Sequence, residues 1–177
     1  DMTQKELRDK LGYVPQKGVL FSGTIDSNIR YGKPEITDAQ VKEAAEVAQA
    51  TEFIDTKPEK YESPVSQGGT NVSGGQKQRL SIARAIAKDP EIFIFDDSFS
   101  ALDFKTDSQL RKALKEYTKD ATTVIVAQRI STILGADQII VLDDGHMAGI
   151  GTHKELMANC EVYQQIARSQ LSEEELA

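Results

Sequence analysis

Two short, unbroken apolar runs separated by a charged segment constrain the fold of this chain more than any other feature. The first lies within Glu91–Phe95 and the second is Thr122–Ala127, with a charged helical pattern at about 105–117 between them. Short continuous apolar runs are typical of strands that are buried on both faces of a parallel sheet. Because strands alternate with helices from residue 90 onward, the sequence predicts an α/β fold.

Further strands are expected on either side of these two runs. Leu11–Val14 predicts a brief strand. Residues 138–142 and 147–150, joined around Asp144-Gly145, predict a hairpin at the edge of the sheet.

The segment between the strand expected at Leu11–Val14 and the run at Glu91–Phe95 has a different character. Residues 17–89 contain no convincing strand, so we expect a mostly helical insertion there. Thr37 or Asp38 is the candidate N-cap of one of its helices, and turn formers dominate residues 58–70.

Composition excludes several classes of protein. The chain has 177 residues with 39% hydrophobic and 28% charged residues, which is ordinary for one globular domain. A net charge of -7, without a cluster of basic and aromatic residues, argues against nucleic acid as a partner. No apolar segment approaches the roughly 20 residues of a bilayer span. Because of this, we expect a soluble polypeptide. Cys160 is the single cysteine, so no intrachain disulfide is expected.

The segment Asn71–Arg79, with the sequence NVSGGQKQR, carries the strongest functional signal. Ser73, Gly74 and Gly75 precede a helical pattern that Pro90 stops. Such a helix start presents unpaired backbone N–H groups, and glycines let an anion approach the backbone closely. For Ser-Gly-Gly alone, an ordinary serine N-cap is the better interpretation. The full string, however, resembles the signature motif of ABC-type ATPases, LSGGQ-x-Q-R, and we name Asn71–Arg79 the signature segment.

Other segments extend the resemblance to the nucleotide-binding domain of ABC exporters. Asp96-Asp97 at the end of the apolar strand resembles the Walker B carboxylates, and Ser100–Asp103 resembles the D-loop. Two adjacent carboxylates are more often solvated loop residues, but a position past the carboxyl end of a buried strand is where α/β sheets place ligands. Val14–Gln16 and Leu20–Ile29 resemble the exporter Q-loop region, and Gly151–Leu156 resembles the family's C-terminal segment.

The resemblance implies a P-loop NTPase-like parallel sheet core with a helical subdomain insertion. Residues 1–16 and 90–177 would form a partial RecA-like ATP-binding core. Residues 17–89 would form the helical subdomain, which ends in the signature helix and contacts the coupling helices of a transmembrane domain.

The resemblance also implies the cofactors, ATP and Mg²⁺, and the residues that serve them. The expected nucleotide-binding residues are Gln16, Ser73, Gly74, Gly75, Gln76 and Asp103. Gln16 and Asp96 are the expected Mg²⁺ ligands. Asp97 and Gln128 are the expected catalytic residues.

A phosphate-binding loop of the form G-x-x-x-x-G-K-[ST] is missing from the sequence. The sole Gly-Lys pair, Gly32-Lys33, lacks a glycine five residues earlier. We therefore expect the domain to be truncated at its N-terminus, to bind ATP poorly alone and to expose apolar surface.

Two residues depart from the pattern of hydrolysing family members. Asp97 stands where those proteins have a glutamate, so the carboxylate reaches about 1.5 Å less far toward an attacking water. Gln128 stands where they have a histidine, and an amide does not titrate. With an intact signature segment, this combination resembles the weakly or non-hydrolytic half of a heterodimeric exporter. The signature segment would then serve the site of a second nucleotide-binding domain.

Two alternatives stay open. A non-transport ABC ATPase fits the signature segment but not the exporter-like Phe21–Ile25. A catalytically inert interaction module is the alternative for the isolated chain. For the parent protein we expect an ATPase at the cytoplasmic face of the cell membrane.

Overall fold

The computed structural model describes residues 2–172. They fall into two compact units, the first up to Val126 and the second from Ala127 onward, and each unit is described by itself.

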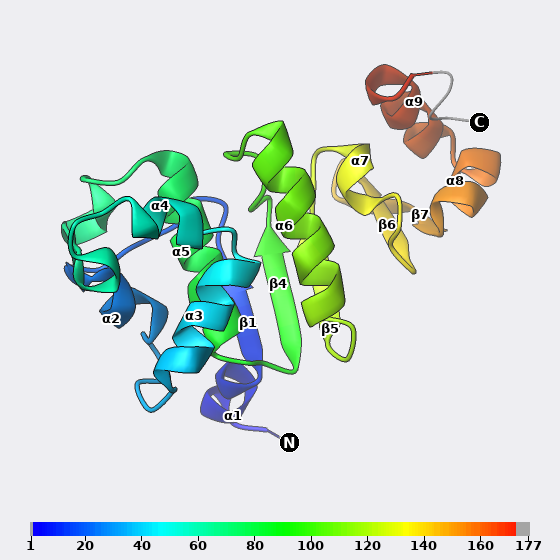
Figure 1. Cartoon of the computed structure of the whole chain (residues 1–177). Helices are drawn as coiled ribbons and strands as arrows, with labels where there is room; N and C mark the ends of the chain where they lie inside the picture. The colour runs from blue at the N-terminus through cyan, green and yellow to red at the C-terminus, as the bar shows by residue number, and fades with distance from the viewer. Residues whose placement is uncertain (1, 173–177) are drawn as a thin grey trace. The chain divides into compact units, whose positions relative to one another are not determined.

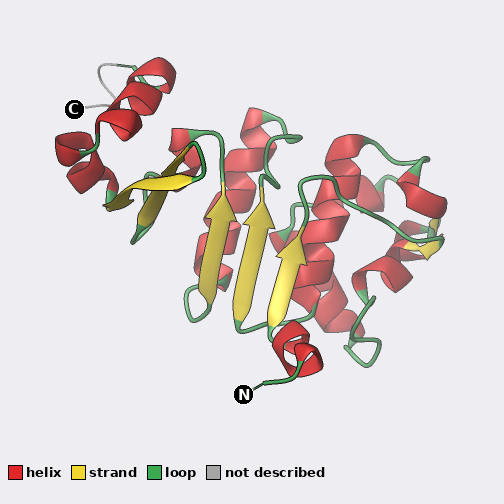
Figure 2. Ribbon diagram, turned by 180° about the vertical axis from the view of Figure 1, so that it is seen from behind, coloured by secondary structure: helices red, strands yellow, loops and turns green. Residues whose placement is uncertain are grey.

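A three-stranded parallel sheet organises the first unit (Figure 2). Its strands are β1 (Leu11–Val14), β4 (Ile92–Asp96) and β5 (Thr122–Val126), in the order β1-β4-β5. Val14 pairs with Phe95, and Phe95 pairs with Ile125, so the three carboxyl ends lie at one edge. This arrangement confirms the predicted α/β fold.

Helices cover one face of this sheet. Helix α5 (Gly74–Ala87) and helix α6 (Phe104–Tyr117) lie in front of the strands in Figure 1, whereas the strands lie in front of the helices in the reverse view of Figure 2. Phe93 and Phe95 on β4 point into the core and are each 1% exposed. This face is closed by apolar side chains.

The opposite face of the sheet is largely exposed. Tyr13 on β1 is 55% exposed, and Val124 and Val126 on β5 are 46% and 53% exposed. Burial on both faces was predicted for the runs that form β4 and β5. The prediction is wrong for β5, whereas Ile94 on the same face of β4 is half-buried. The expected exposure of apolar surface is confirmed. We call Tyr13, Val124 and Val126 the bare face.

The predicted insertion is mostly helical. Its helices are α2 (Ile25–Ile29), α3 (Asp38–Val47), α4 (Thr51–Asp55) and α5, with the 3₁₀ turns η1 (Lys60–Glu62) and η2 (Gln67–Gly69). Thr37 is the N-cap of α3 and Asp38 is its first residue. Two strands were not predicted: β2 (Gly23–Thr24) and β3 (Pro64–Val65) pair antiparallel, and at two residues each they are too short to produce a pattern. Helix α1 (Gln4–Asp9) precedes β1.

The second unit is a hairpin with three helices. Strands β6 (Ile139–Asp143) and β7 (His146–Gly151) pair antiparallel, which confirms the predicted hairpin. Its predicted place at the edge of the parallel sheet is wrong for the described residues, because β6 and β7 form a separate two-stranded sheet. The turn residues Asp144 and Gly145 have φ values of 44° and 79°, which are typical of a tight hairpin turn. The helices are α7 (Ile130–Ile133), α8 (His153–Asn159) and α9 (Glu161–Gln170). In residues 2–172, no helix has the length and apolar character needed to cross a bilayer.

Candidate nucleotide-binding site

The loop after β1 and the loop after β4 meet at the carboxyl edge of the sheet. There the Nε2 of Gln16 donates a hydrogen bond to the Oδ2 of Asp97 at 3.1 Å, although 81 residues separate them in sequence. The buried hydroxyl of Ser98 donates to the carbonyl oxygen of Val14 at 2.9 Å and joins the two loops a second time. Two of the predicted site residues therefore lie in direct contact.

Asp97 has an unusual backbone conformation. Its φ is 43°, in the left-handed region that non-glycine residues seldom adopt and that aspartate tolerates better than most. Its N–H donates to the carbonyl oxygen of Val126 at 2.9 Å, and its own carbonyl oxygen accepts from the hydroxyl of Ser100 at 3.0 Å. These contacts turn the chain sharply away from β4, so that the carboxylate of Asp97 faces Gln16.

Asp96, the last residue of β4, has a partner that sequence reasoning missed. The hydroxyl of Tyr13 on the neighbouring strand donates to the Oδ2 of Asp96 at 3.2 Å. Partial burial and the nearby Asp96 carboxylate raise the pKa of Tyr13, so its hydroxyl stays protonated and able to donate. Because Tyr13 pairs with Ile94, which is two residues before Asp96, both side chains lie on the same face. The alternation of side chains along a strand, with a period of two residues, was the signal in the sequence that could have revealed this contact.

The signature segment begins helix α5 with a capping box. The hydroxyl of Ser73 accepts from the N–H of Gln76 at 3.2 Å, and the Oε1 of Gln76 accepts from the N–H of Ser73 at 3.1 Å. The N-cap interpretation is thus correct as local structure. It leaves the glycines accessible, because a Cβ on Gly74 would meet no atom within 4 Å. A Cβ on Gly75 would lie 3.5 Å from the carbonyl oxygen of Ala101, which places the D-loop beside this helix start.

Asp103 in the D-loop caps helix α6. Its Oδ1 accepts from the N–H of Thr106 at 3.0 Å. Hydrogen bonds from Thr106 hold the pKa of Asp103 below its ordinary value, so the carboxylate stays charged. Capping alone accounts for this carboxylate, and a contact between Asp103 and nucleotide stays a prediction.

Gln128 belongs to the second unit, whereas Asp97 belongs to the first. The carbonyl oxygen of Gln128 accepts from the Nε2 of Gln170 at 2.9 Å. The catalytic pairing of Gln128 with Asp97 stays a prediction.

The donor set at the sheet edge fits Mg²⁺. Within residues 2–172, no three His, Cys, Asp or Glu residues form a cluster that could hold a metal ion. Magnesium, however, is usually bound through one or two protein oxygen ligands together with phosphates and waters. The carboxylate of Asp96 and the amide oxygen of Gln16 are ligands of that kind.

Sequence reasoning also missed a buried polar network between α2 and α5. Asn28 on α2 is 1% exposed, and its Nδ2 donates to the carbonyl oxygens of Phe21 and Thr24, each at 2.9 Å. Arg84 on α5 donates from Nε to the carbonyl oxygen of Asn28 and from NH1 to that of Val19, each at 2.8 Å. Burial lowers the pKa of Arg84. This network fixes α2 on α5.

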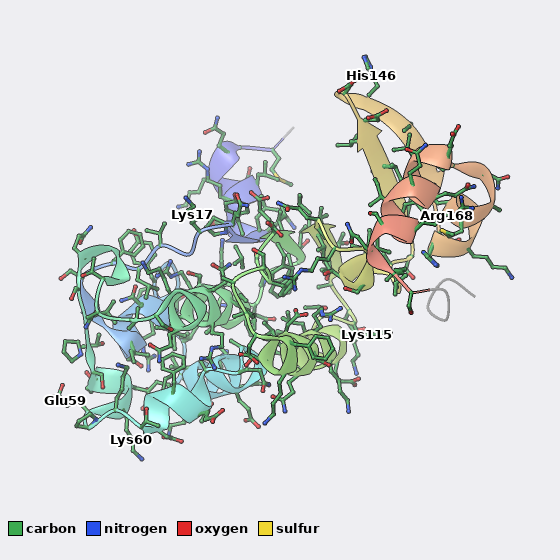
Figure 3. All side chains as sticks on the ribbon, turned by 90° about the horizontal axis from the view of Figure 1, so that it is seen from above. Lys17, Glu59, Lys60, Lys115, His146 and Arg168 are labelled. Carbon is green, nitrogen blue, oxygen red and sulfur yellow. The ribbon has the colours of Figure 1, made fainter. Side chains whose placement is uncertain are left out.

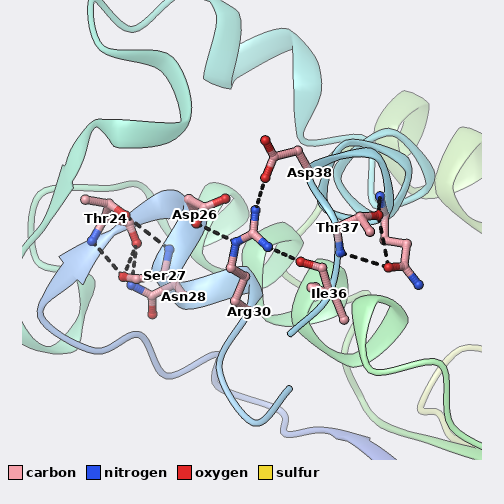
Figure 4. A network of polar contacts seen from close by, with 9 residues as sticks. Thr24, Asp26, Ser27, Asn28, Arg30, Ile36, Thr37 and Asp38 are labelled. Carbon is pink, nitrogen blue, oxygen red and sulfur yellow. Dashed lines mark hydrogen bonds and ion pairs between the residues drawn. The ribbon is translucent and has the colours of Figure 1, made fainter. Parts of the chain in front are cut away.

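Figure 4 shows how the same helix is held at its two ends. At its start, the hydroxyl of Thr24 accepts from the N–H of Ser27 at 3.1 Å, and the hydroxyl oxygen of Ser27 accepts from the N–H of Thr24 at 2.8 Å. At its end, Arg30 pairs with Asp26 at 2.7 Å and with Asp38.

Comparisons with known proteins point to one family. The family model described as ABC transporter matches residues 1–100. The chain is 46% identical over 169 residues to an uncharacterized ABC transporter ATP-binding protein of Mycobacterium tuberculosis, covering 94% of this chain and 29% of that protein. It is 44% identical over 174 residues to a similarly described protein of Bacillus subtilis, covering 98% of this chain and 30% of the relative.

A solved structure is also similar. A bacterial Atm1-family ABC exporter with ATP bound matches with a TM-score of 0.92 and 40% identity, over 97% of this chain and 30% of that one. The chain thus spans less than a third of the length of these relatives.

Proposed function

This chain belongs to the ABC transporter family, and we propose that it is part of the ATP-binding domain that drives an exporter. The observation that carries the proposal is the contact between Gln16 and Asp97 at the carboxyl edge of a parallel sheet. In α/β sheets that edge is where ligands bind. The similarity to an ATP-bound exporter favours export over a non-transport ATPase.

The sheet edge would hold the Mg²⁺ that accompanies ATP. Asp96 and Gln16 would supply oxygen ligands, and Tyr13 holds the Asp96 carboxylate in place through its hydroxyl. Bound MgATP supplies the phosphoanhydride bond whose cleavage drives the transporter. Because Gln16 also contacts Asp97, a ligand that draws Gln16 toward Mg²⁺ would change the surroundings of Asp97 as well.

The start of helix α5 would bind the nucleotide of a second domain. Ser73 and Gly74 lie at the N-terminus of a 14-residue helix, and the space beside Gly74 is open. Backbone N–H groups and the positive end of the helix dipole attract a terminal phosphate there. In this arrangement Asp97 serves one site of a dimer and the signature segment serves the other.

We further propose that the site beside Asp97 hydrolyses ATP slowly and that its dimer partner is a different chain. Aspartate is one methylene shorter than the glutamate of hydrolysing members, and Gln128 offers an amide in place of an imidazole. The partner would carry Glu and His at the matching positions and a poorer signature segment. Residues 17–89 would contact the coupling helices of the transmembrane domain at the cytoplasmic face of the membrane.

The test uses the full-length protein reconstituted in lipid vesicles. We expect ATP hydrolysis that depends on Mg²⁺, and a Ser73→Glu variant with strongly reduced turnover because its carboxylate repels the phosphate. A Ser169→Glu variant is the matched control, because it makes the same substitution at an exposed serine of α9, outside the signature segment. Absence of ATP hydrolysis by the full-length protein with any partner would contradict the proposed function.

The slow site has its own test. Asp97→Glu together with Gln128→His should raise turnover by about two orders of magnitude if that site limits the rate, which is the lower end of the contribution of a well-placed general base. A partner with an intact signature segment and an aspartate at the position of Asp97 would contradict the division of roles.

A further inference from the structure

The side-chain amide of Gln78 lies buried between helix α5 and the loop that carries Gln16. Gln78 is 2% exposed. Its Nε2 donates to the carbonyl oxygen of Pro15 at 3.1 Å, and its Oε1 accepts from the N–H of Gly18 at 2.9 Å. A carbonyl accepts only and an N–H donates only, so these partners fix the orientation of the amide. Gln78 therefore holds the backbone on both sides of Gln16, and we call these two hydrogen bonds the grip.

The same loop touches the helix backbone at Gly18. A Cβ on Gly18 would lie 2.7 Å from the hydroxyl oxygen of Ser81 and 3.0 Å from the carbonyl oxygen of Lys77. No side chain fits in this space, so the loop rests directly on α5. Lys17, which is labelled in Figure 3, is exposed in this loop, as is Gln16. Pro15 and Gly18, whose backbone is held, are half-buried, while the two side chains between them are exposed.

The position of Gln78 connects two functional segments. Toward the sheet, the gripped loop carries Gln16 to within 3.1 Å of Asp97. Toward the start of the helix, Gly75 lies about one turn before Gln78 and borders the D-loop at Ala101. One buried amide thus joins the Gln16–Asp97 contact to the helix that begins at the signature segment.

We propose that Gln78 is a positioning residue: its amide sets the reach of Gln16 from helix α5 and so ties the Mg²⁺ ligand at one nucleotide site to the signature surface of the other. This inference rests on the proposed function for the role of Gln16. The grip itself is a property of the fold, and it is measurable without nucleotide.

The experiment compares two variants of the full-length protein with the unchanged one. Gln78→Met keeps the length of the side chain and removes both hydrogen bonds. Ile86→Val is the control, because Ile86 is a fully buried residue of the same helix and the variant loses one methyl group away from the loop. Hydrogen exchange of the peptide that contains Gly18 is measured without nucleotide. The Mg²⁺ dependence of ATP binding is measured separately, because the site beside Asp97 is proposed to bind ATP and to hydrolyse it slowly.

For Gln78→Met we expect the Gly18 amide to exchange at least about fivefold faster, because its buried acceptor is gone. We also expect the Mg²⁺ concentration for half-maximal ATP binding to rise about tenfold, as for other residues that orient a metal ligand. Ile86→Val should leave both quantities within about twofold of the unchanged protein.

Two results would overturn the proposal. Unchanged exchange at Gly18 in Gln78→Met would show that the grip is absent. Faster exchange with a Mg²⁺ dependence equal to that of Ile86→Val would show that Gln78 supports the loop without positioning Gln16. If the unchanged protein fails to hydrolyse ATP, the proposed function fails, and exchange at Gly18 alone then decides whether the grip exists.

Discussion

Replacing Asn28 by alanine should release helix α2 from helix α5. The Oδ1 of Asn28 accepts from the N–H of Phe21 at 2.9 Å and from NH2 of Arg84 at 2.8 Å, and its Nδ2 donates to Phe21 and Thr24. Each buried hydrogen bond of this kind contributes about 1 kcal/mol net, so losing the side chain costs about 4 kcal/mol. Water cannot replace these bonds easily, because Asn28 is 1% exposed.

Native-state hydrogen exchange of the α2 amides measures this loss directly, since it reports the local opening free energy without requiring a single unfolding transition. A cost of about 4 kcal/mol corresponds to exchange that is roughly 700-fold faster, unless global unfolding is reached first.

The matched control is Asn71→Ala. Asn71 also bonds to the backbone through both ends of its amide, from Nδ2 to Pro64 at 2.8 Å and from Ser66 to Oδ1 at 2.9 Å, but it is exposed. This variant should leave α2 exchange unchanged and cost about 0.5 kcal/mol or less near residue 66. If Asn28→Ala accelerated α2 exchange by less than about tenfold, the reasoning from burial and bond count would be refuted.

Three further outcomes are expected. Burial raises the pKa of Tyr163. The stability that this residue gives the second unit should therefore be complete below about pH 10 and be lost as the pH rises further. Urea titrations at several pH values should show this loss in the unchanged protein and not in Tyr163→Phe. Gly149→Ala should destabilise the hairpin by about 1–3 kcal/mol in the same titrations, because the added Cβ would lie 2.8 Å from the sulfur of Cys160. Ser73→Ala removes the cap of α5 and should cost about 1 kcal/mol at the Gln76 amide, measured by exchange, while ATP hydrolysis by the full-length protein falls.

Local features of the sequence predicted the elements well. The strand Leu11–Val14 and the caps at Ser73 and Thr37 lie where their patterns placed them, because each pattern reflects interactions within a few residues. The hairpin in the second unit was predictable for the same reason, since Asp144-Gly145 favours positive φ values.

Contacts between distant segments were not predictable in this way. The partners of Gln78 are 60 and 63 residues away in sequence, and Gln16 meets Asp97 across 81 residues. No periodicity encodes such distances, so the resemblance to a family was needed to suggest that Gln16 and Asp97 share a site. The resemblance gave no hint of the Gln78 amide or of the Tyr13 hydroxyl on Asp96.

The bare face bears on whether copies of this chain associate with one another in solution. Tyr13, Val124 and Val126 stay in water until something covers them, and β5 is the outer strand of the sheet that the described first unit builds. An outer strand beside exposed apolar side chains is a template for pairing with a neighbouring copy of the same chain. A concentrated preparation of this chain by itself is therefore expected to aggregate through β5.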